Sequence, residues 1–168
     1  MKRSIRIERT LPHPVGTVWR ALTEAPLLGK WLMENDFEPK LGHRFNFRMK
    51  PQRGWDGLTH CEVIALEPKR RVAYTYRGQA TGEKPLGCAG VDSTQADRAV
   101  KGFFFDLDTV LSFSIAPGSR SDGNETTVLT VEHSGFKGFK MVLVSLIMES
   151  GWRRRVLRRL KTVLAELT

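Results

Sequence analysis

Alternation of apolar and polar residues along much of the chain predicts an antiparallel sheet. In six short segments every second side chain is apolar, which is the spacing of a strand with one buried face. Short connections separate most of these segments, and they favour an antiparallel meander. One of them, Gly54-Trp-Asp-Gly57, has the composition of a turn. The expected strands cover residues 4–8, 44–50, 58–66, 72–76, 110–115 and 127–132.

Two short helices are expected between the first and second of these strands. Pro14 suits the first turn of a helix, because the N–H that proline lacks has no intrahelical partner there. One apolar stripe with helical spacing follows, at Val15, Val18, Trp19 and Leu22. A second helix is predicted to begin at Pro26, since a residue that precedes proline, here Ala25, disfavours helical geometry.

The C-terminal segment predicts one long amphipathic helix over about residues 138–167. Thirty helical residues would span about 45 Å. Gly151 lies inside this helix, and a mid-helix glycine costs about 1 kcal/mol relative to alanine, so we expect a kink, a break or a close backbone contact there. The apolar stripe of the helix comprises Trp152, Val156, Leu157, Leu160, Val163, Leu164 and Leu167.

The alternation lapses between residues 78 and 105. This stretch is rich in glycine and longer than ordinary connections, so it is interpreted as an inserted loop, with a helical turn near residues 94–100. There are no internal repeats and no composition shift that marks a second domain. Residues 1–168 are therefore expected to form a single α+β domain, with a curved antiparallel sheet, two short helices and one long helix packed across the sheet.

Composition excludes several classes of protein. Hydrophobic residues at 40% and charged residues at 27% are ordinary for a folded globular chain, not for a disordered or collagen-like one. Cys61 and Cys88 have no C-x-x-C partner, so neither a disulfide scaffold nor a metal site is indicated. The longest apolar run is Met141–Met148, which is too short for a membrane span, and the N-terminus has no secretory pattern. We therefore expect a cytoplasmic location.

The net charge of +9 is concentrated in part in the C-terminal helix. After Trp152 this segment carries six Lys or Arg residues and a single carboxylate, Glu166. Arg154, Arg155 and Arg158 are taken as a candidate basic surface, which could attract nucleic acid, anionic lipid or an acidic partner. The alternative is that these arginines only form the solvated face of the helix, as most charge runs do.

Several motifs resemble those of the AHSA-type branch of the SRPBCC (START-like) superfamily. This branch is named after an activator of a heat-shock chaperone ATPase. The resemblance covers the chain except residues 78–105 and 137–150, and it implies a helix-grip fold in which the sheet grips the long helix over a hydrophobic cavity. Relatives include lipid carriers, hormone receptors, cyclases and chaperone regulators, so fold alone does not settle function. The motifs are Arg9-Thr-Leu-Pro-His-Pro-Val-Gly-Thr-Val-Trp-Arg-Ala-Leu-Thr23, Trp31, the Gly57 turn, Glu62-Val-Ile, Glu67-Pro68, His133-Ser-Gly-Phe136 and Gly151-Trp152.

A ligand cavity is predicted between the sheet and the long helix, because concave aromatic-rich sites are the usual form of an apolar pocket. The alternative is a solid core made of the same side chains. Among them the two tyrosines matter most, since a buried phenol needs a hydrogen-bond partner that a ligand could supply. The candidate cavity residues are Trp31, Phe45, Phe47, Val63, Tyr74, Tyr76, Leu111, Phe113, Leu129, Val131, His133 and Trp152.

No catalytic motif, dinucleotide fingerprint or phosphate-binding loop is found, so the sequence indicates no catalytic residue and no cofactor. His133 could act as an acid or base, but a histidine at such a position is more often hydrogen-bonded to its surroundings. The leading hypothesis is a binding protein for an apolar or aromatic small molecule, such as a lipid or polyketide. The alternative is a regulator that binds a chaperone or other ATPase. The sequence gives less support to three further hypotheses. These are nucleic-acid binding, a cyclase or hydrolase activity, and a homodimer formed through Met141–Met148.

Overall fold

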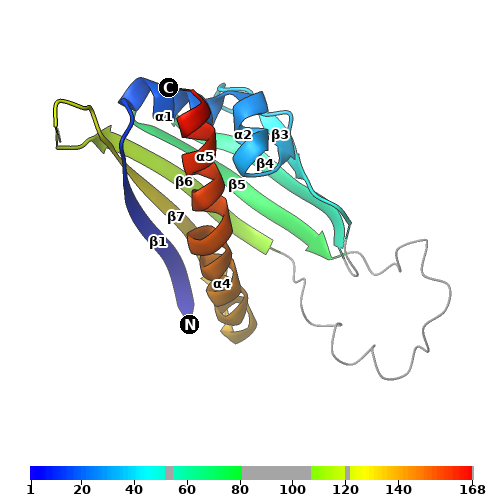
Figure 1. The fold of residues 1–168 in the computed structure, drawn as a ribbon. Coiled ribbons are helices and arrows are strands. Elements are labelled where there is room, and N and C mark those ends of the chain that lie inside the picture. Colours follow the sequence, from blue (N-terminus) through cyan, green and yellow to red (C-terminus); the bar gives the residue numbers. More distant parts are fainter. Residues whose placement is uncertain (52–54, 81–106, 120–121, 168) are drawn as a thin grey trace, which may run out of the picture.

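A curved antiparallel sheet of seven strands forms the main layer of the described structure (Figure 1). This computed structural model describes residues 1–51, 55–80, 107–119 and 122–167. The strand order across the sheet is β1-β7-β6-β5-β4-β3-β2, and the first and last long strands, β1 and β7, therefore lie side by side. The strands are β1 (Lys2–Leu11), β2 (Glu34–Asn35), β3 (Arg44–Arg48), β4 (Trp55–Glu67), β5 (Arg71–Ala80), β6 (Leu107–Pro117) and β7 (Thr127–Lys137).

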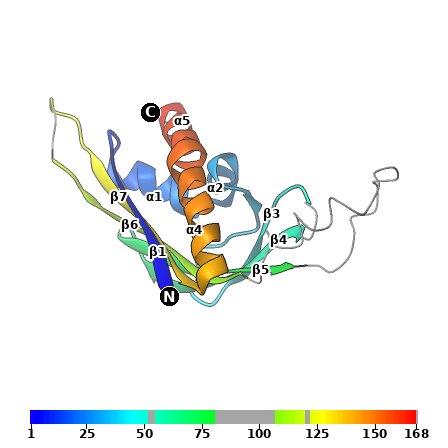
Figure 2. The same cartoon turned by 90° about the horizontal axis from the view of Figure 1, so that it is seen from below.

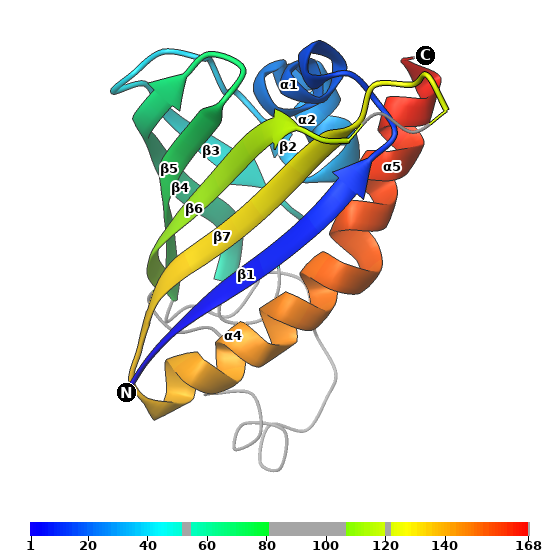
Figure 3. The ribbon, with the colours of Figure 1, turned by 90° about the vertical axis from the view of Figure 1, so that its left-hand side faces the viewer.

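All the helices lie on one side of this sheet (Figures 2 and 3). Helices α1 and α2 pack against the last helix, α5, whereas α4 contacts strands β1 and β7. This is the α+β helix-grip arrangement that the sequence predicts. The helices are α1 (Val15–Thr23), α2 (Ala25–Trp31), α4 (Phe139–Gly151), the π-helical turn η1 (Trp152–Val156) and α5 (Leu157–Glu166). None of the helices in the described ranges has both the length and the apolarity that crossing a bilayer requires.

The prediction of a turn at residues 54–57 is wrong for residues 55–57, which the structure describes. Residues 55–57 already belong to β4, and the N–H of Met49 donates to the carbonyl of Gly57. Gly57 has a φ of +84°, and the pairing between β4 and β5 shifts register between Trp55 and Thr59. A glycine that signals a turn in the sequence thus serves a bulge inside a long strand.

The long C-terminal helix continues through Gly151 without a break, and among the described residues no close backbone contact lies beside that glycine. Instead, the helix widens into the π turn η1, in which the N–H of Leu157 donates to the carbonyl of Trp152, five residues earlier. An α-helix would turn two residues with this spacing to different faces, whereas a π turn brings them to the same side. Trp152 and Leu157 are accordingly both buried in the core.

The inserted loop is predicted to begin at residue 78, but its first three residues belong to a strand. Residues 78–80 continue strand β5, and Gly78 pairs with Thr59 of β4 and Leu107 of β6. The rest of the predicted loop, including its helical turn at residues 94–100 and Cys88, lies outside the described residues.

Three aromatic rings join the helices to the middle of the sheet. Phe113 of β6 contacts Trp31 of α2 at a centroid distance of 5.7 Å and Trp152 at 5.9 Å, both in edge-to-face geometry. All three side chains are buried, and such pairs contribute about 0.5–1.5 kcal/mol beyond the burial of their area. Leu160 and Leu164 of α5 are fully buried in the same core.

The same substitution, Leu to Ala, should cost more stability on the packed face of the long helix than on its outer face. Leu160→Ala removes a fully buried side chain, so we expect it to lower the free energy of unfolding by about 2–5 kcal/mol. Leu146→Ala changes a side chain that is 49% exposed and should cost less than about 1 kcal/mol. Urea denaturation of both variants measures the difference, and equal losses would contradict the described placement of the helix.

Candidate functional site

One row of side chains crosses the sheet beneath the helices. Cross-strand pairing places Val63 beside Tyr74, Tyr74 beside Leu111, and Leu111 beside His133. On the far side, His133 pairs with Ile5 of β1. All five side chains are buried, so the row is an apolar surface into which one phenol and one imidazole are set.

Aromatic rings surround Tyr74. Its ring centroid lies 5.2 Å from that of Phe45, 5.7 Å from Phe47, 6.1 Å from Phe113 and 6.2 Å from Phe37. Phe45 and Phe47 come from β3, and Phe37 lies between β2 and β3. The Tyr74 phenol is thus enclosed almost wholly by carbon.

The hydroxyl of Tyr74 is buried and has no hydrogen-bond partner among the described residues. Burial raises the pKa of this phenol well above its usual value of about 10, because the apolar surroundings disfavour the phenolate. Tyr74 therefore keeps its proton and offers a hydrogen bond to whatever comes within reach.

Hydrogen bonds around Thr109 fix the tautomer of His133. The single hydroxyl proton of Thr109 is donated to the carbonyl of Tyr76, 3.0 Å away. The same hydroxyl oxygen lies 2.8 Å from Nε2 of His133, and for both contacts to be hydrogen bonds that nitrogen carries the proton and donates. In a neutral imidazole Nδ1 is then an acceptor. It is buried and has no partner in the described part of the chain.

His133 is neutral across the physiological range. Burial lowers the pKa of this imidazole to about 3, because the apolar environment disfavours the charged form. The rings of Phe136 and Tyr76 lie 4.8 and 5.1 Å from it, centroid to centroid, and no carboxylate among the described residues hydrogen-bonds to it. A group with this pKa is a weak base, and its main capacity is to accept a hydrogen bond.

Two further polar groups line the same side of the sheet and are hydrogen-bonded within it. Tyr76 forms a hydrogen bond with the side chain of Thr59, and Cys61 donates from Sγ to the carbonyl of Thr59 over 3.8 Å. Burial raises the pKa of both the phenol and the thiol far above their usual values. Cys61 is therefore a protonated thiol with no character of a nucleophile.

All the predicted cavity residues are buried, and the row and its aromatic neighbours bring most of them into contact. Their role in a ligand cavity stays a prediction, since the described rings touch one another directly. Sequence reasoning missed Thr109, although it continues the alternation of Leu111 and Phe113 by one step, and Phe37, which no periodic pattern marks. The buried set is Trp31, Phe45, Phe47, Val63, Tyr74, Tyr76, Leu111, Phe113, Leu129, Val131, His133 and Trp152.

The opposite, outer face of the sheet is polar. Nδ1 of His60 donates to the amide oxygen of Asn46 over 2.6 Å, and Arg44 pairs with Glu62 at 3.4 Å. These side chains border a surface hollow of about 440 Å³, which opens on the outer side of β3, β4 and β5. The polar groups at its border thus pair with one another.

The predicted basic residues Arg154, Arg155 and Arg158 are exposed on the C-terminal helix. Within the described ranges, no three His, Cys, Asp or Glu side chains gather at a spacing suited to a metal ion.

Comparisons with known proteins agree with this geometry. The family model described as "Activator of Hsp90 ATPase homolog 1-like protein" matches residues 12–165. The crystal structure of protein MLL2253 from Mesorhizobium loti is 31% identical, with a TM-score of 0.71 and 99% of both chains covered. The search of curated proteins finds no match.

More distant solved structures share the fold. Protein BH1534 from Bacillus halodurans is 20% identical, with a TM-score of 0.65, and the match covers 98% of this chain and 99% of that one. DynU16, a putative protein in the dynemicin biosynthetic locus, is 18% identical with a TM-score of 0.63, and the match covers 96% of this chain but 47% of DynU16. The family match spans nearly the whole chain, and the chain belongs to the Activator of Hsp90 ATPase homolog 1-like protein family.

Proposed function

We propose that this chain is a small cytoplasmic binding protein that encloses an apolar, largely aromatic molecule between its sheet and its C-terminal helix. The observation that carries the proposal is a pair of polar atoms in the apolar interior, the Tyr74 hydroxyl and Nδ1 of His133. Both are buried, and neither has a hydrogen-bond partner among the described residues.

Unpaired polar atoms of this kind are rare, because each costs about 1–3 kcal/mol when it is buried without a partner. A ligand that pairs with both atoms removes this cost, whereas a ligand without polar groups leaves it in place. The family fold supports this use of the interior, since the sheet and helix of such a domain face each other across apolar side chains.

The two atoms also define the ligand's chemistry. Tyr74 donates, so it selects a carbonyl, ether or hydroxyl oxygen, while Nδ1 of His133 accepts and selects a hydroxyl or N–H. Their residues lie in one row on strands β5 and β7, which are two strand spacings, roughly 10 Å, apart. The ligand proposed here is therefore a flat aromatic body with oxygen functions toward two ends.

The same groups favour binding over catalysis. Burial lowers the pKa of His133 to about 3, far from the value near neutrality at which a general base works best. Burial also holds the Cys61 thiol in its protonated form by raising its pKa.

Tyr74→Phe should weaken ligand binding without weakening the fold. The probe is 2,6-dihydroxynaphthalene, which displaces an environment-sensitive apolar dye, and we expect its affinity to fall roughly fivefold, as for a lost hydrogen bond of about 1 kcal/mol. The ligand-free variant should be as stable as the parent or more so, because an unpaired buried hydroxyl is gone.

Two controls sharpen this test. Unsubstituted naphthalene should bind the parent and Tyr74→Phe equally, since it has no oxygen for the phenol. Tyr76→Phe removes a hydroxyl that is bonded to Thr59 and should lower the stability of the ligand-free protein. No saturable binding of any probe, or a Tyr74→Phe variant that binds the dihydroxy probe as well as the parent does, would overturn the proposal.

The protein should become less stable as the pH falls, because His133 titrates. Its folded pKa of about 3 lies below the unfolded value of about 6.5, so the unfolded state binds one more proton between these values. The His133 contribution is thus complete above about pH 6.5 and declines as the pH falls, by up to about 1.4 kcal/mol per pH unit.

Urea denaturation of the parent and of His133→Gln at a series of pH values isolates this contribution. Glutamine keeps an N–H for Thr109 but does not titrate. The parent should lose stability more steeply than the variant below about pH 6.5 and equally above it. Identical slopes at every pH would show that His133 does not titrate as its burial requires.

A further inference from the structure

Helix α4 exposes an apolar face that points away from the sheet. Phe139, Leu143, Leu146 and Ile147 are 69%, 48%, 49% and 51% exposed. Their spacing of four, three and one residues puts them on one side of the helix. The opposite side of α4, with Met141, Ser145 and Met148, packs toward the core. A helix that is apolar on both sides is ordinarily buried on both, so the exposed side needs an explanation.

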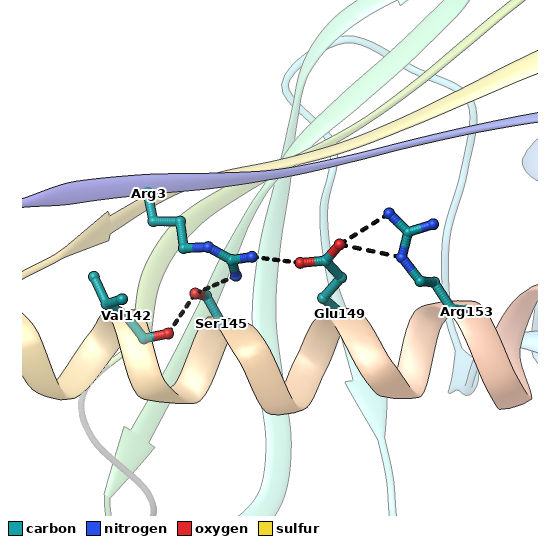
Figure 4. Close-up of polar contacts among 5 residues, drawn as sticks. All are labelled: Arg3, Val142, Ser145, Glu149 and Arg153. Atoms are coloured by element: carbon teal, nitrogen blue, oxygen red, sulfur yellow. Dashed lines mark hydrogen bonds and ion pairs between the residues drawn. The ribbon is translucent and has the colours of Figure 1, made fainter.

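A polar network fixes which side of α4 faces outward (Figure 4). Arg3 of β1 donates to the hydroxyl of Ser145 over 2.8 Å and pairs with the carboxylate of Glu149. Ser145 donates in turn to the carbonyl of Val142, and Arg153 pairs with Glu149 at 2.9 Å. The two arginines lower the pKa of Glu149, which therefore stays ionised near neutral pH. The network holds the helix against β1 on the side away from Phe139 and Leu143.

Cations flank this apolar face at both ends. Lys137 ends β7 just before α4, Lys140 lies in the first turn of α4, and beyond the end of α4 the helix is basic. The two carboxylates of the helix are engaged, Glu149 with Arg3 and Arg153, and Glu166 with Lys30. In the part of the chain that the structure describes, no carboxylate pairs with the remaining cations of η1 and α5. Those exposed cations are Arg154, Arg155, Arg158, Arg159 and Lys161.

We infer that the outward face of the C-terminal helix docks on an anionic lipid bilayer. Four apolar side chains between two clusters of cations are the pattern of a helix that lies in the interfacial plane, with apolar side chains among the acyl chains and cations at the headgroups. The net charge of +9 adds a general attraction to such a surface. The inference does not depend on the proposed ligand, and it gives an apolar-molecule carrier a place to load and unload.

Charge and shape favour a bilayer over a protein. The apolar face runs from Phe139 to Ile147, about 12 Å along the helix. A strip of that length and about 10 Å wide covers on the order of 120 Å², which is small beside the roughly 800 Å² that each partner buries in a stable protein interface. A bilayer needs no shape complementarity and adapts to a convex helix. A second copy of this chain would bring a further charge of +9 to the same face.

Flotation with lipid vesicles tests the inference. The full chain should float with vesicles of phosphatidylcholine and phosphatidylglycerol, remain unbound with phosphatidylcholine alone, and dissociate as salt rises. Leu143→Gln with Leu146→Gln removes apolar contacts, and Arg155→Glu with Arg158→Glu reverses two cations. Each pair should lower the affinity for anionic vesicles roughly tenfold or more, since each apolar or cationic contact contributes separately.

Matched controls change equally exposed residues elsewhere. Leu41→Gln with Ile64→Gln removes two exposed apolar side chains, and Lys40→Glu with Arg70→Glu makes the same change in net charge. If the helix is the part that binds the vesicles, neither control should change the affinity for anionic vesicles more than about twofold. Unfolding curves of all four variants should match the parent, because every substituted side chain is exposed.

Three results would overturn the inference. One is equal binding to neutral and anionic vesicles, or no binding to either. Another is a loss in the control variants as large as in the helix variants, which would indicate a charge effect of the whole molecule. The third is a change of molecular mass in light scattering on Leu143→Gln with Leu146→Gln in the absence of lipid, which would make the face a contact between copies of this chain.

Discussion

The fold depends on one packing constraint, which is that the C-terminal helix buries one side against the concave face of the sheet. Phe113 lies at the centre of this contact, with Trp31 and Trp152 against its edges. The π turn makes the contact possible over the whole length, because it brings Trp152 and Leu157 to the same side of the helix. Without that local widening, the apolar sides of α4 and α5 would face in different directions.

This packing has a chemical consequence for the interior. Because helices cover the concave face, polar groups on the strands beneath them must find partners among themselves. Thr109, Tyr76 and His133 do so in part, and their hydrogen bonds leave the imidazole with a single free acceptor at Nδ1. Tyr74, enclosed by rings, finds none. The two unpaired atoms are what distinguish this interior from an ordinary apolar core, and they give the proposed ligand its polarity.

Much of the fold could be predicted from the sequence, because period-two alternation and the helical stripe record which side chains are buried. All twelve residues that these patterns predicted to face inward are buried, although the patterns missed Phe37 and Thr109. They could not reveal the Gly57 bulge, since a glycine with positive φ has the same signature in a turn and in a bulge. Nor could they predict the tautomer of His133, which depends on one hydroxyl proton donated across strands, or the π turn, which depends on the register of helix against sheet. Contacts between distant residues set both.

The unpaired atoms of Tyr74 and His133 lie on the sheet side of the helices, and the exposed apolar face of α4 lies on their outer side. An aromatic molecule could bind at either place. Nuclear Overhauser effects between 2,6-dihydroxynaphthalene and the protein separate these sites most directly. The account predicts contacts from the probe to the ring protons of Tyr74 and His133, with a shift of the Nδ1 resonance of His133. Contacts confined to Phe139, Leu143 and their exposed neighbours, with the His133 resonances unmoved, would contradict it.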